Sequence, residues 1–93
     1  MRRIEPTNAF KRDFKRVKAS PKHRDLESLL RELLNLLMAD APLPPRNRDH
    51  PLTGDWKDFR DCHVKPDLVL IYRKAGVDTL QLVRLGSHSE LGL

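Results

Sequence analysis

Histidines are the residues of this sequence whose type and position best suit catalysis. Three of the four, His50, His63 and His88, lie in the second half of the chain. An unperturbed imidazole has a pKa of about 6.5, so it can accept or donate a proton near neutral pH. One reaction that such groups support is cleavage of RNA by its own 2′-hydroxyl. This reaction needs a base for the 2′ proton and an acid for the departing 5′ oxygen.

The same reaction needs positive charge beside the crowded phosphoryl oxygens, and electrostatic stabilisation is often its largest contribution. Five basic side chains near the histidines in sequence are candidates for this role: Arg46, Arg48, Lys57, Arg60 and Arg84. Each feature also has a plain structural interpretation. A loop histidine is often a solvated surface residue, and Asp67 after Pro66 is a normal turn acid. Three histidines and a carboxylate could also bind a metal ion, but their spacing matches no compact ligand motif, so we expect none.

Positive charge is concentrated at the start of the chain. Residues 1–24 hold nine Lys/Arg and two acidic residues, whereas residues 25–93 carry a small negative excess. A basic segment of this kind attracts phosphates, although it is also typical of a solvated helix face. Binding to a membrane surface is a weaker interpretation, because its apolar stripe holds only Phe10, Phe14 and Val17.

The elements that must position the histidines follow from periodicity. Thr7 is a plausible N-cap for a basic helix to about Lys18, and Ser20-Pro21 predicts the start of a leucine-rich helix that ends at Met38. The leucine-rich helix is interpreted as core, with a dimer helix as the alternative. A long loop begins at Ala41 and carries His50, and a long loop in a small domain is often functional.

The rest of the sequence is β-like. Runs at 59–64, 68–72 and 80–85 are separated by turn signals, and Arg3-Ile4-Glu5 is a weak further candidate. The short connections predict an antiparallel meander, with the wholly apolar 68–72 run in the centre. Both helices should pack on one face, giving an α+β fold. Since strand ends lie beside the starts of their neighbours, we expect His63 and Asp67 to be near each other.

Length and composition exclude several classes. Ninety-three residues suit one domain, and Cys62, the single cysteine, excludes an internal disulfide. The longest apolar run is too short to span a bilayer, and the N-terminus lacks the apolar stretch of a secretory signal. We therefore expect a cytoplasmic protein with no membrane partner.

Several motifs from residue 43 onward strongly resemble the YafQ-type toxins of the RelE/ParE superfamily. They are Leu43-Pro44-Pro45, Arg48-Asp49-His50-Pro51-Leu52, Gly54-Asp55-Trp56-Lys57, Arg60-Asp61-Cys62-His63, Pro66-Asp67, Leu70-Ile71-Tyr72 and Arg84-Leu85-Gly86-Ser87-His88-Ser89. The resemblance implies a RelE-like fold: two N-terminal helices packed on a curved antiparallel sheet of about four strands, with residues 1–93 as one domain.

The resemblance also implies a toxin that cleaves messenger RNA on the ribosome without a cofactor. By position, the family's functional residues correspond to His50, His63, Asp67 and His88, and Asp61 matches a further implicated position. Arg60 and Arg84 are the candidates to support them with positive charge. The RNA-binding residues would be basic: Lys11, Arg12, Lys15, Arg16, Lys18, Arg48 and Lys57. The implied protein partner is a DinJ/RelB-like antitoxin.

The sequence departs from this family at two positions. Gly92 stands four residues after the last histidine, where the family commonly has an aromatic residue, and Leu68 stands where Trp is frequent. Stacking of a base by these residues is therefore not expected. This difference favours one alternative, an RNA- or antitoxin-binding module that has lost catalysis. A metal-dependent hydrolase is the other alternative.

Overall fold

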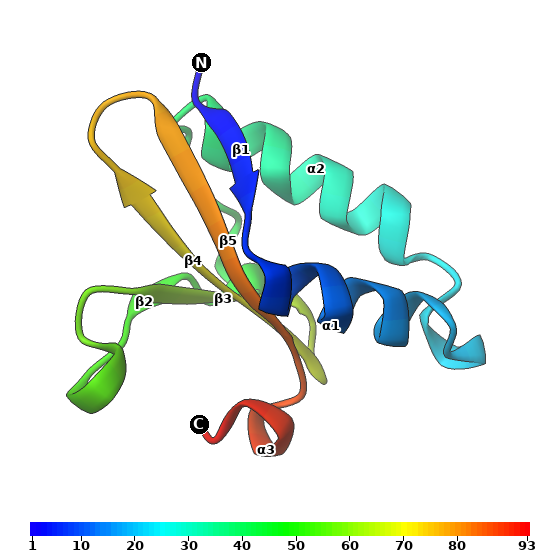
Figure 1. Ribbon diagram of the computed structural model, residues 1–93. Coiled ribbons are helices and arrows are strands. Elements are labelled where there is room, and N and C mark those ends of the chain that lie inside the picture. Colours follow the sequence, from blue (N-terminus) through cyan, green and yellow to red (C-terminus); the bar gives the residue numbers. More distant parts are fainter.

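A mixed sheet of five strands forms the centre of the protein, in the order β1-β5-β4-β3-β2 (Figure 1). The computed structural model describes all residues, 1–93. The strands are β1 (Arg3–Pro6), β2 (His50–Pro51), β3 (Arg60–Lys65), β4 (Leu68–Ala75) and β5 (Thr79–Gly86). The α-helices are α1 (Asn8–Lys18), α2 (Leu26–Met38) and α3 (His88–Leu91), and single 3-10 turns cover Pro21–His23, Pro45–Asn47 and Gly54–Trp56.

The predicted meander is confirmed: β3, β4 and β5 pair antiparallel in chain order. β4 is the central strand, and its residues Leu68 to Tyr72 are at most 1% exposed. A strand covered on both faces has no solvated side, so its sequence is apolar at every position rather than at alternate positions.

The expected sheet of about four antiparallel strands needs correction in its details, although the α+β class is confirmed. The sheet has five strands, and β1 pairs with β5 in parallel, from Arg3 opposite Thr79 to Pro6 opposite Leu82. β2 is only two residues long and pairs with β3. Neither short strand has a marked sequence pattern, because each is stabilised by a neighbouring strand rather than by its own propensity.

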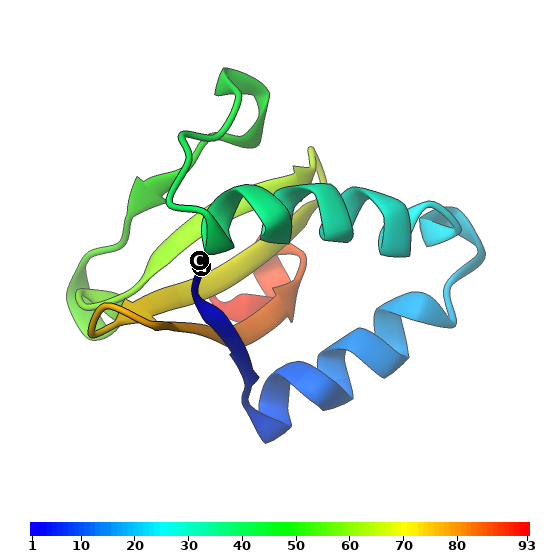
Figure 2. The ribbon, with the colours of Figure 1, turned by 90° about the horizontal axis from the view of Figure 1, so that it is seen from above.

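Both long helices cover one face of the sheet. Thr7 caps α1 by accepting a hydrogen bond from the Phe10 amide at 3.1 Å, as the sequence predicts. The leucine-rich helix begins at Leu26 rather than Pro21, because Pro21–His23 forms a 3-10 turn that buries His23. In Figure 2 the two helices form a V, closed at this turn and bridged by β1 at its open end.

The helix-covered face holds the main core, in which α1 and α2 contribute six buried residues: Phe10, Val17, Leu26, Leu30, Leu33 and Leu37. The opposite face has a smaller cluster, formed by Val69, Ile71 and Leu91 with half-buried residues around them. That second cluster lies beneath α3 and the loop that follows β2. It is therefore the face on which the loop histidine and the C-terminal histidine can meet.

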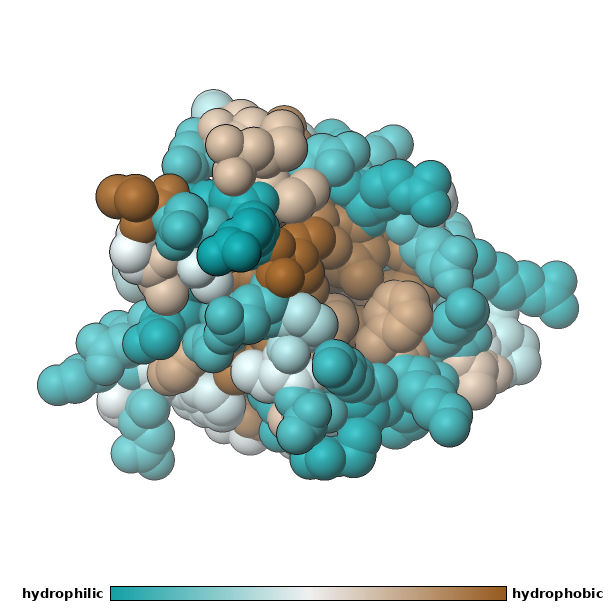
Figure 3. Space-filling view, turned by 45° about the horizontal axis from the view of Figure 1, so that its top comes forward, coloured by the Kyte–Doolittle hydropathy of each residue, from teal (hydrophilic) through white to brown (hydrophobic).

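An exposed apolar groove runs between β1, α1 and α2, and Figure 3 shows an apolar hollow framed by hydrophilic side chains on this side of the molecule. Its apolar lining consists of Ile4, Phe14, Leu30, Leu34 and Met38. No helix has the length and apolar character needed to cross a bilayer.

Candidate active site

Strand pairing brings the three C-terminal histidines to one face of the sheet. His50 in β2 lies opposite Asp61 in β3, and His63, two residues further along β3, has the same orientation as Asp61. His63 lies opposite Val69, which in turn lies opposite Gly86 at the end of β5. The chain then turns into α3, so that the His88 ring lies beside the His63 ring, with centroids 5.0 Å apart.

A cavity of about 480 Å³ opens beside these side chains. His50, Asp61 and His88 line it together with six further residues: Leu52, Thr53, Asp55, Trp56, Gly92 and Leu93. The convergence of the three imidazoles in one region, which the sequence alone could not establish, is therefore present. The carboxylate among them is Asp61.

The proton position on His50 follows from its contacts. Its Nδ1 atom lies 2.8 Å from the Arg48 carbonyl oxygen, which can only accept a hydrogen bond. Nδ1 must therefore carry the hydrogen, and in the neutral ring Nε2 is left as a bare acceptor. Arg48 presents this carbonyl from a left-handed conformation with φ of 45°, so the backbone geometry at Arg48 fixes the tautomer of His50.

Asp61 is a buried carboxylate with few partners. It is 2% exposed, and its Oδ1 lies 3.1 Å from His50 Nδ1. The single Nδ1 hydrogen points to Arg48 instead, so Oδ1 accepts no hydrogen bond. Burial raises the pKa of the Asp61 carboxyl, against the opposing effect of charge on His50, His63 and His88. Asp61 thus places a compensating negative charge among the three imidazoles.

His63 is held in its neutral form. Burial lowers the pKa of its imidazole, and positive charge on His88 lowers it further. Asp61 has the opposite effect but does not outweigh the other two. In the contacting pair, His63 is therefore the ring that releases its proton more readily than a free imidazole does.

The position of His88 depends on the cap of α3. The Ser87 hydroxyl accepts from the Glu90 amide at 3.2 Å, and the Ser87 amide donates to Glu90 Oε1 at 2.9 Å. These reciprocal bonds form a capping box, which fixes the start of the helix where His88 stands. A Cβ at Gly86 would lie 3.1 Å from Arg16 Nη2 and 3.2 Å from Glu90 Oε1, so only glycine fits here without displacement.

Asp67 lies in the turn between β3 and β4, and its carboxylate is placed differently from that of Asp61. Its Oδ2 atom is 3.5 Å from Lys22 Nζ, and the side chain lines a separate cavity with Ser87 and Glu90. Asp67 thus lies close along the chain to His63 and shares a cavity with the residue that precedes His88, but it hydrogen-bonds to neither ring. Its predicted catalytic role remains a prediction.

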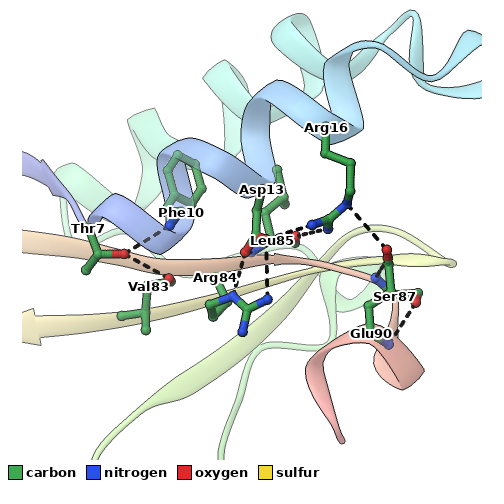
Figure 4. Close-up of polar contacts among 9 residues, drawn as sticks. All are labelled: Thr7, Phe10, Asp13, Arg16, Val83, Arg84, Leu85, Ser87 and Glu90. Carbon is green, nitrogen blue, oxygen red and sulfur yellow. Dashed lines mark hydrogen bonds and ion pairs between the residues drawn. The ribbon is translucent and has the colours of Figure 1, made fainter.

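The guanidinium of Arg84, predicted to support catalysis, is engaged in a structural network with α1 (Figure 4). Asp13, which is 3% exposed, accepts from Arg84 Nε at 2.6 Å and from the Leu85 amide at 3.0 Å. Arg16 donates to Asp13 at 2.9 Å and lies 3.4 Å from Glu90. These contacts connect α1 to β5 and α3, so Arg84 and Arg16 act at least as structural residues.

The other basic residues predicted to act on RNA differ in whether an acidic side chain already pairs with them. Arg60 Nε lies 3.2 Å from Asp49 Oδ1, which also accepts from the Tyr72 hydroxyl. Lys18 Nζ pairs with Glu27 at 2.7 Å. The predicted RNA-binding residues that are exposed and have no ion pair are Lys11, Arg12, Lys15, Arg48 and Lys57. These five retain their charge for a ligand.

No group of three or more His, Cys, Asp or Glu side chains is arranged to hold a metal ion.

Sequence reasoning did not identify Asp13. The signal that could have identified Asp13 is its position as an acid within a strongly basic segment. A buried carboxylate needs a basic partner, and an isolated acid among Lys and Arg is a candidate for such a pair. The central place of Asp61 was not evident either, because it depends on the pairing of the two-residue strand β2.

Comparisons with known proteins give a consistent result. The family model for YafQ, described as a bacterial toxin of type II toxin–antitoxin systems, matches residues 2–92. The mRNA interferase toxin YafQ of Escherichia coli K12 is 38% identical over 90 residues, which are 97% of this chain and 95% of that protein.

Solved structures show the same relationship. YafQ in the crystal structure of the E. coli DinJ–YafQ complex has a TM-score of 0.81 and 39% identity, with 98% of both chains covered. A metal-bound toxin from Helicobacter pylori has a TM-score of 0.84 and 44% identity, with 98% of this chain and 99% of that one covered.

Proposed function

Since this chain belongs to the YafQ family of toxins from type II toxin–antitoxin systems, we propose that it cleaves messenger RNA on the ribosome by histidine acid–base catalysis. Its E. coli relative is an mRNA interferase. The observation that carries the proposal is the lining of one cavity by His50, His88 and Asp61. Two imidazoles at one cavity supply the acid and the base that attack by a 2′-hydroxyl requires.

His50 is assigned as the base. Its Nδ1 hydrogen is engaged by the Arg48 carbonyl, so Nε2 accepts the proton of the 2′-hydroxyl. The O2′–P bond forms as the P–O5′ bond breaks, leaving a 2′,3′-cyclic phosphate and a 5′-hydroxyl.

His88 is assigned as the acid that protonates the departing 5′ oxygen. Its neighbour His63 has a lowered pKa and stays neutral, so it can accept a hydrogen bond from a protonated His88 and orient it. Asp61 offsets the positive charge that the imidazoles carry during the cycle. Arg48 and Lys57 would contact the phosphates, and the exposed Asp67 would complete the set by contacting the RNA backbone or an imidazole.

The basic face of α1 is the proposed ribosome-binding surface. Lys11, Arg12 and Lys15 are exposed and free of ion pairs, as contact with ribosomal RNA requires. E. coli YafQ forms a complex with DinJ, and we extend this to a DinJ/RelB-like antitoxin as the protein partner of this chain.

Ribosomes programmed with a defined message provide the test, with mapping of the RNA ends. His50→Gln and His88→Gln should each reduce the cleavage rate by about 10²- to 10⁴-fold, whereas the control His23→Gln, outside the cavity, should cleave normally if it folds. A message with sulfur at the scissile 5′ position has a leaving group that needs no acid. It should restore the rate of the His88 variant and not that of the His50 variant.

Two outcomes would contradict this proposal. Unchanged cleavage by both variants would remove the catalytic assignment. Salt-sensitive RNA binding without cleavage by the unmodified chain would instead support a binding module, which the glycine at position 92 favours. The H. pylori relative is metal-bound, so the assays should be repeated with excess chelator. We expect full activity, since the acid and base are both imidazoles.

A further inference from the structure

The residues that line the histidine cavity fall into two chemical kinds. His50, Asp61 and His88 carry ionisable groups suited to a phosphodiester. Leu52, Trp56 and Leu93 are apolar, and no phosphate chemistry uses them. An apolar lining of this kind beside a reaction centre fits a ligand part that is itself apolar and flat-sided, and in RNA that part is the base.

Trp56 is the only tryptophan of the chain and the only aromatic residue lining this cavity besides the imidazoles. It is half-buried and packs against the cluster of Val69, Ile71 and Leu91. Its ring meets Phe59 edge to face, with centroids 5.4 Å apart and planes at 81°. The indole is thus anchored on one side, while part of its surface remains open to the cavity. Such a rigid ring can stack on a base at little entropic cost.

The indole N–H supplies a second observation. Buried tryptophans usually donate this hydrogen to a partner, but none of the protein's hydrogen bonds involves the Trp56 side chain. The Trp56 N–H is not among the buried side-chain atoms that lack a partner, so it is accessible to solvent and open to a ligand.

Apart from the imidazoles, no other residue can provide stacking at this site. Leu68 is 1% exposed and belongs to the main core on the opposite face of the sheet. Gly92 has no side chain, and a Cβ there would meet no heavy atom within 4 Å. The cavity is therefore open at its C-terminal side, and Trp56 is the only ring beyond the imidazoles.

Charge determines how a nucleotide would lie. Asp55 lines the cavity next in sequence to Trp56, and its carboxylate repels a phosphate. On the histidine side, the Asp61 carboxylate is surrounded by imidazoles, and the protonated His88 of the proposed mechanism attracts a phosphate. The backbone would therefore follow the imidazoles and direct a base toward the indole.

From this arrangement we propose that Trp56 is the base-stacking residue of the cavity, holding the base of a nucleotide next to the scissile phosphate. The proposal rests on the function proposed above and adds to it the residue that positions the RNA. Stacking on an aromatic side chain is tolerant of sequence, since every base has a π-face. It would orient the RNA strand so that the 2′-hydroxyl faces His50.

The single tryptophan makes the test direct, because intrinsic tryptophan fluorescence reports only on Trp56. The unmodified chain is titrated with a 2′-fluoro hexanucleotide, which lacks the attacking hydroxyl, and with an abasic hexamer of equal charge. We expect saturable quenching by the first and none by the second. Equal responses to both, or binding of the first by calorimetry without any change in fluorescence, would overturn the proposal.

Variants provide an independent measurement. Trp56→Phe keeps an aromatic ring and should bind within a few fold of the unmodified chain. Trp56→Leu should bind roughly 5- to 150-fold more weakly, and it should lose a similar factor in kcat/KM on ribosomes. Phe14→Leu, which removes a half-buried ring far from the cavity, is the matched control. Circular dichroism verifies that each variant folds.

The two proposals fail separately. Quenching without any cleavage would refute catalysis and leave base stacking in place. Cleavage on ribosomes that Trp56→Leu leaves unchanged would refute stacking, whatever the free protein binds, and leave the histidine assignment in place.

Discussion

Among single residues, Asp61 has an environment that is unfavourable to stability. It is 2% exposed, its Oδ1 accepts no hydrogen bond, and burial raises the pKa of its carboxyl. A folded-state pKa above the unfolded value means that protonated Asp61 stabilises the fold below about pH 4. That contribution is lost as the pH rises through the folded-state pKa. At neutral pH, the ionised carboxylate therefore lowers the free energy of unfolding. Its position among three histidines, whose positive charge it can offset, explains why a carboxylate stands here.

Replacing Asp61 separates its effect on stability from its effect on the pKa of His63. Asp61→Asn should raise the free energy of unfolding at pH 7 by about 1 kcal/mol, because it removes an ionised group from a buried site. It should also lower the pKa of the His63 imidazole further, since Asp61 is the one nearby charge that raises that pKa. Urea unfolding and an NMR titration of the His63 ring measure the two quantities.

The NMR titration tests whether the Asp61 carboxylate acts on the His63 ring. Asp58→Asn, at an exposed position outside the cavity, serves as the control and should leave the His63 titration unchanged. A His63 pKa that stays the same in Asp61→Asn would show that the carboxylate does not act on the imidazoles.

At the scale of elements, side chains of α1 extend the hydrogen bonding that β1 begins along the outer edge of β5. The last residue of β1, Pro6, lies opposite Leu82, and beyond it Thr7 donates from its hydroxyl to the Val83 carbonyl at 2.9 Å. Asp13 then accepts from the Leu85 amide, and Arg16 donates to the Leu85 carbonyl at 3.1 Å. Side chains of a helix thus satisfy a strand edge that would otherwise be exposed.

Asp13 is the centre of this contact, and its removal should be costly. Asp13→Ala leaves Arg84 and the Leu85 amide without their acceptor, so the free energy of unfolding at pH 7 should fall by about 3–5 kcal/mol. Asp13→Asn should lose less, because an amide oxygen can still accept both bonds. Urea denaturation of the three proteins gives the comparison, and a loss below about 1 kcal/mol in the alanine variant would contradict this account.

The pH dependence of stability provides a second measurement for the same contact. Burial would raise the pKa of Asp13, but hydrogen bonds from Arg84, Leu85 and Arg16 outweigh burial and lower it. The ionised carboxylate therefore stabilises the fold above about pH 4. This stability is lost as the pH falls through the folded-state pKa. Asp13→Asn should show less of this acid loss than the unmodified chain.

At the scale of the whole molecule, charge and chemistry lie on different elements. The first 24 residues carry nine of the eighteen Lys/Arg, and Lys11, Arg12 and Lys15, which have no ion pair, are on α1. His50, His63 and His88 lie on β2, β3 and α3. α1 meets α3, which carries His88, through the ion pair of Arg16 with Glu90, so a polyanion bound along α1 could extend around the edge of the sheet to the imidazoles.

Salt dependence measures the contribution of α1. In Lys11→Ala/Lys15→Ala, the slope of log affinity against log salt for RNA should become less steep by about two, because each lysine would neutralise one phosphate. Arg24→Ala/Arg31→Ala removes the same charge from exposed positions in and before α2 and should leave the slope nearly unchanged. Equal changes in both variants would indicate a general effect of net charge rather than a binding surface.

The sequence by itself determined the elements whose patterns repeat. Phe10, Phe14 and Val17 at helical spacing predicted α1, the leucines predicted α2, and the apolar run from Leu68 to Tyr72 predicted the central strand. Local periodicity is sufficient here, because each element has one face that water must not reach. The histidines could be selected by type and by motif for the same reason, since their chemistry belongs to the side chain.

Only the tertiary structure decided which groups act together. The proximity of Asp61 to His50 depends on β2, two residues long, and the contact of His88 with His63 depends on the pairing of β3, β4 and β5. The parallel pairing of β1, the link from Asp13 to Arg84 and the opening of Trp56 into the cavity join residues distant in sequence. Such contacts gain their free energy from pairing and burial across the fold, and no local pattern of residues records them.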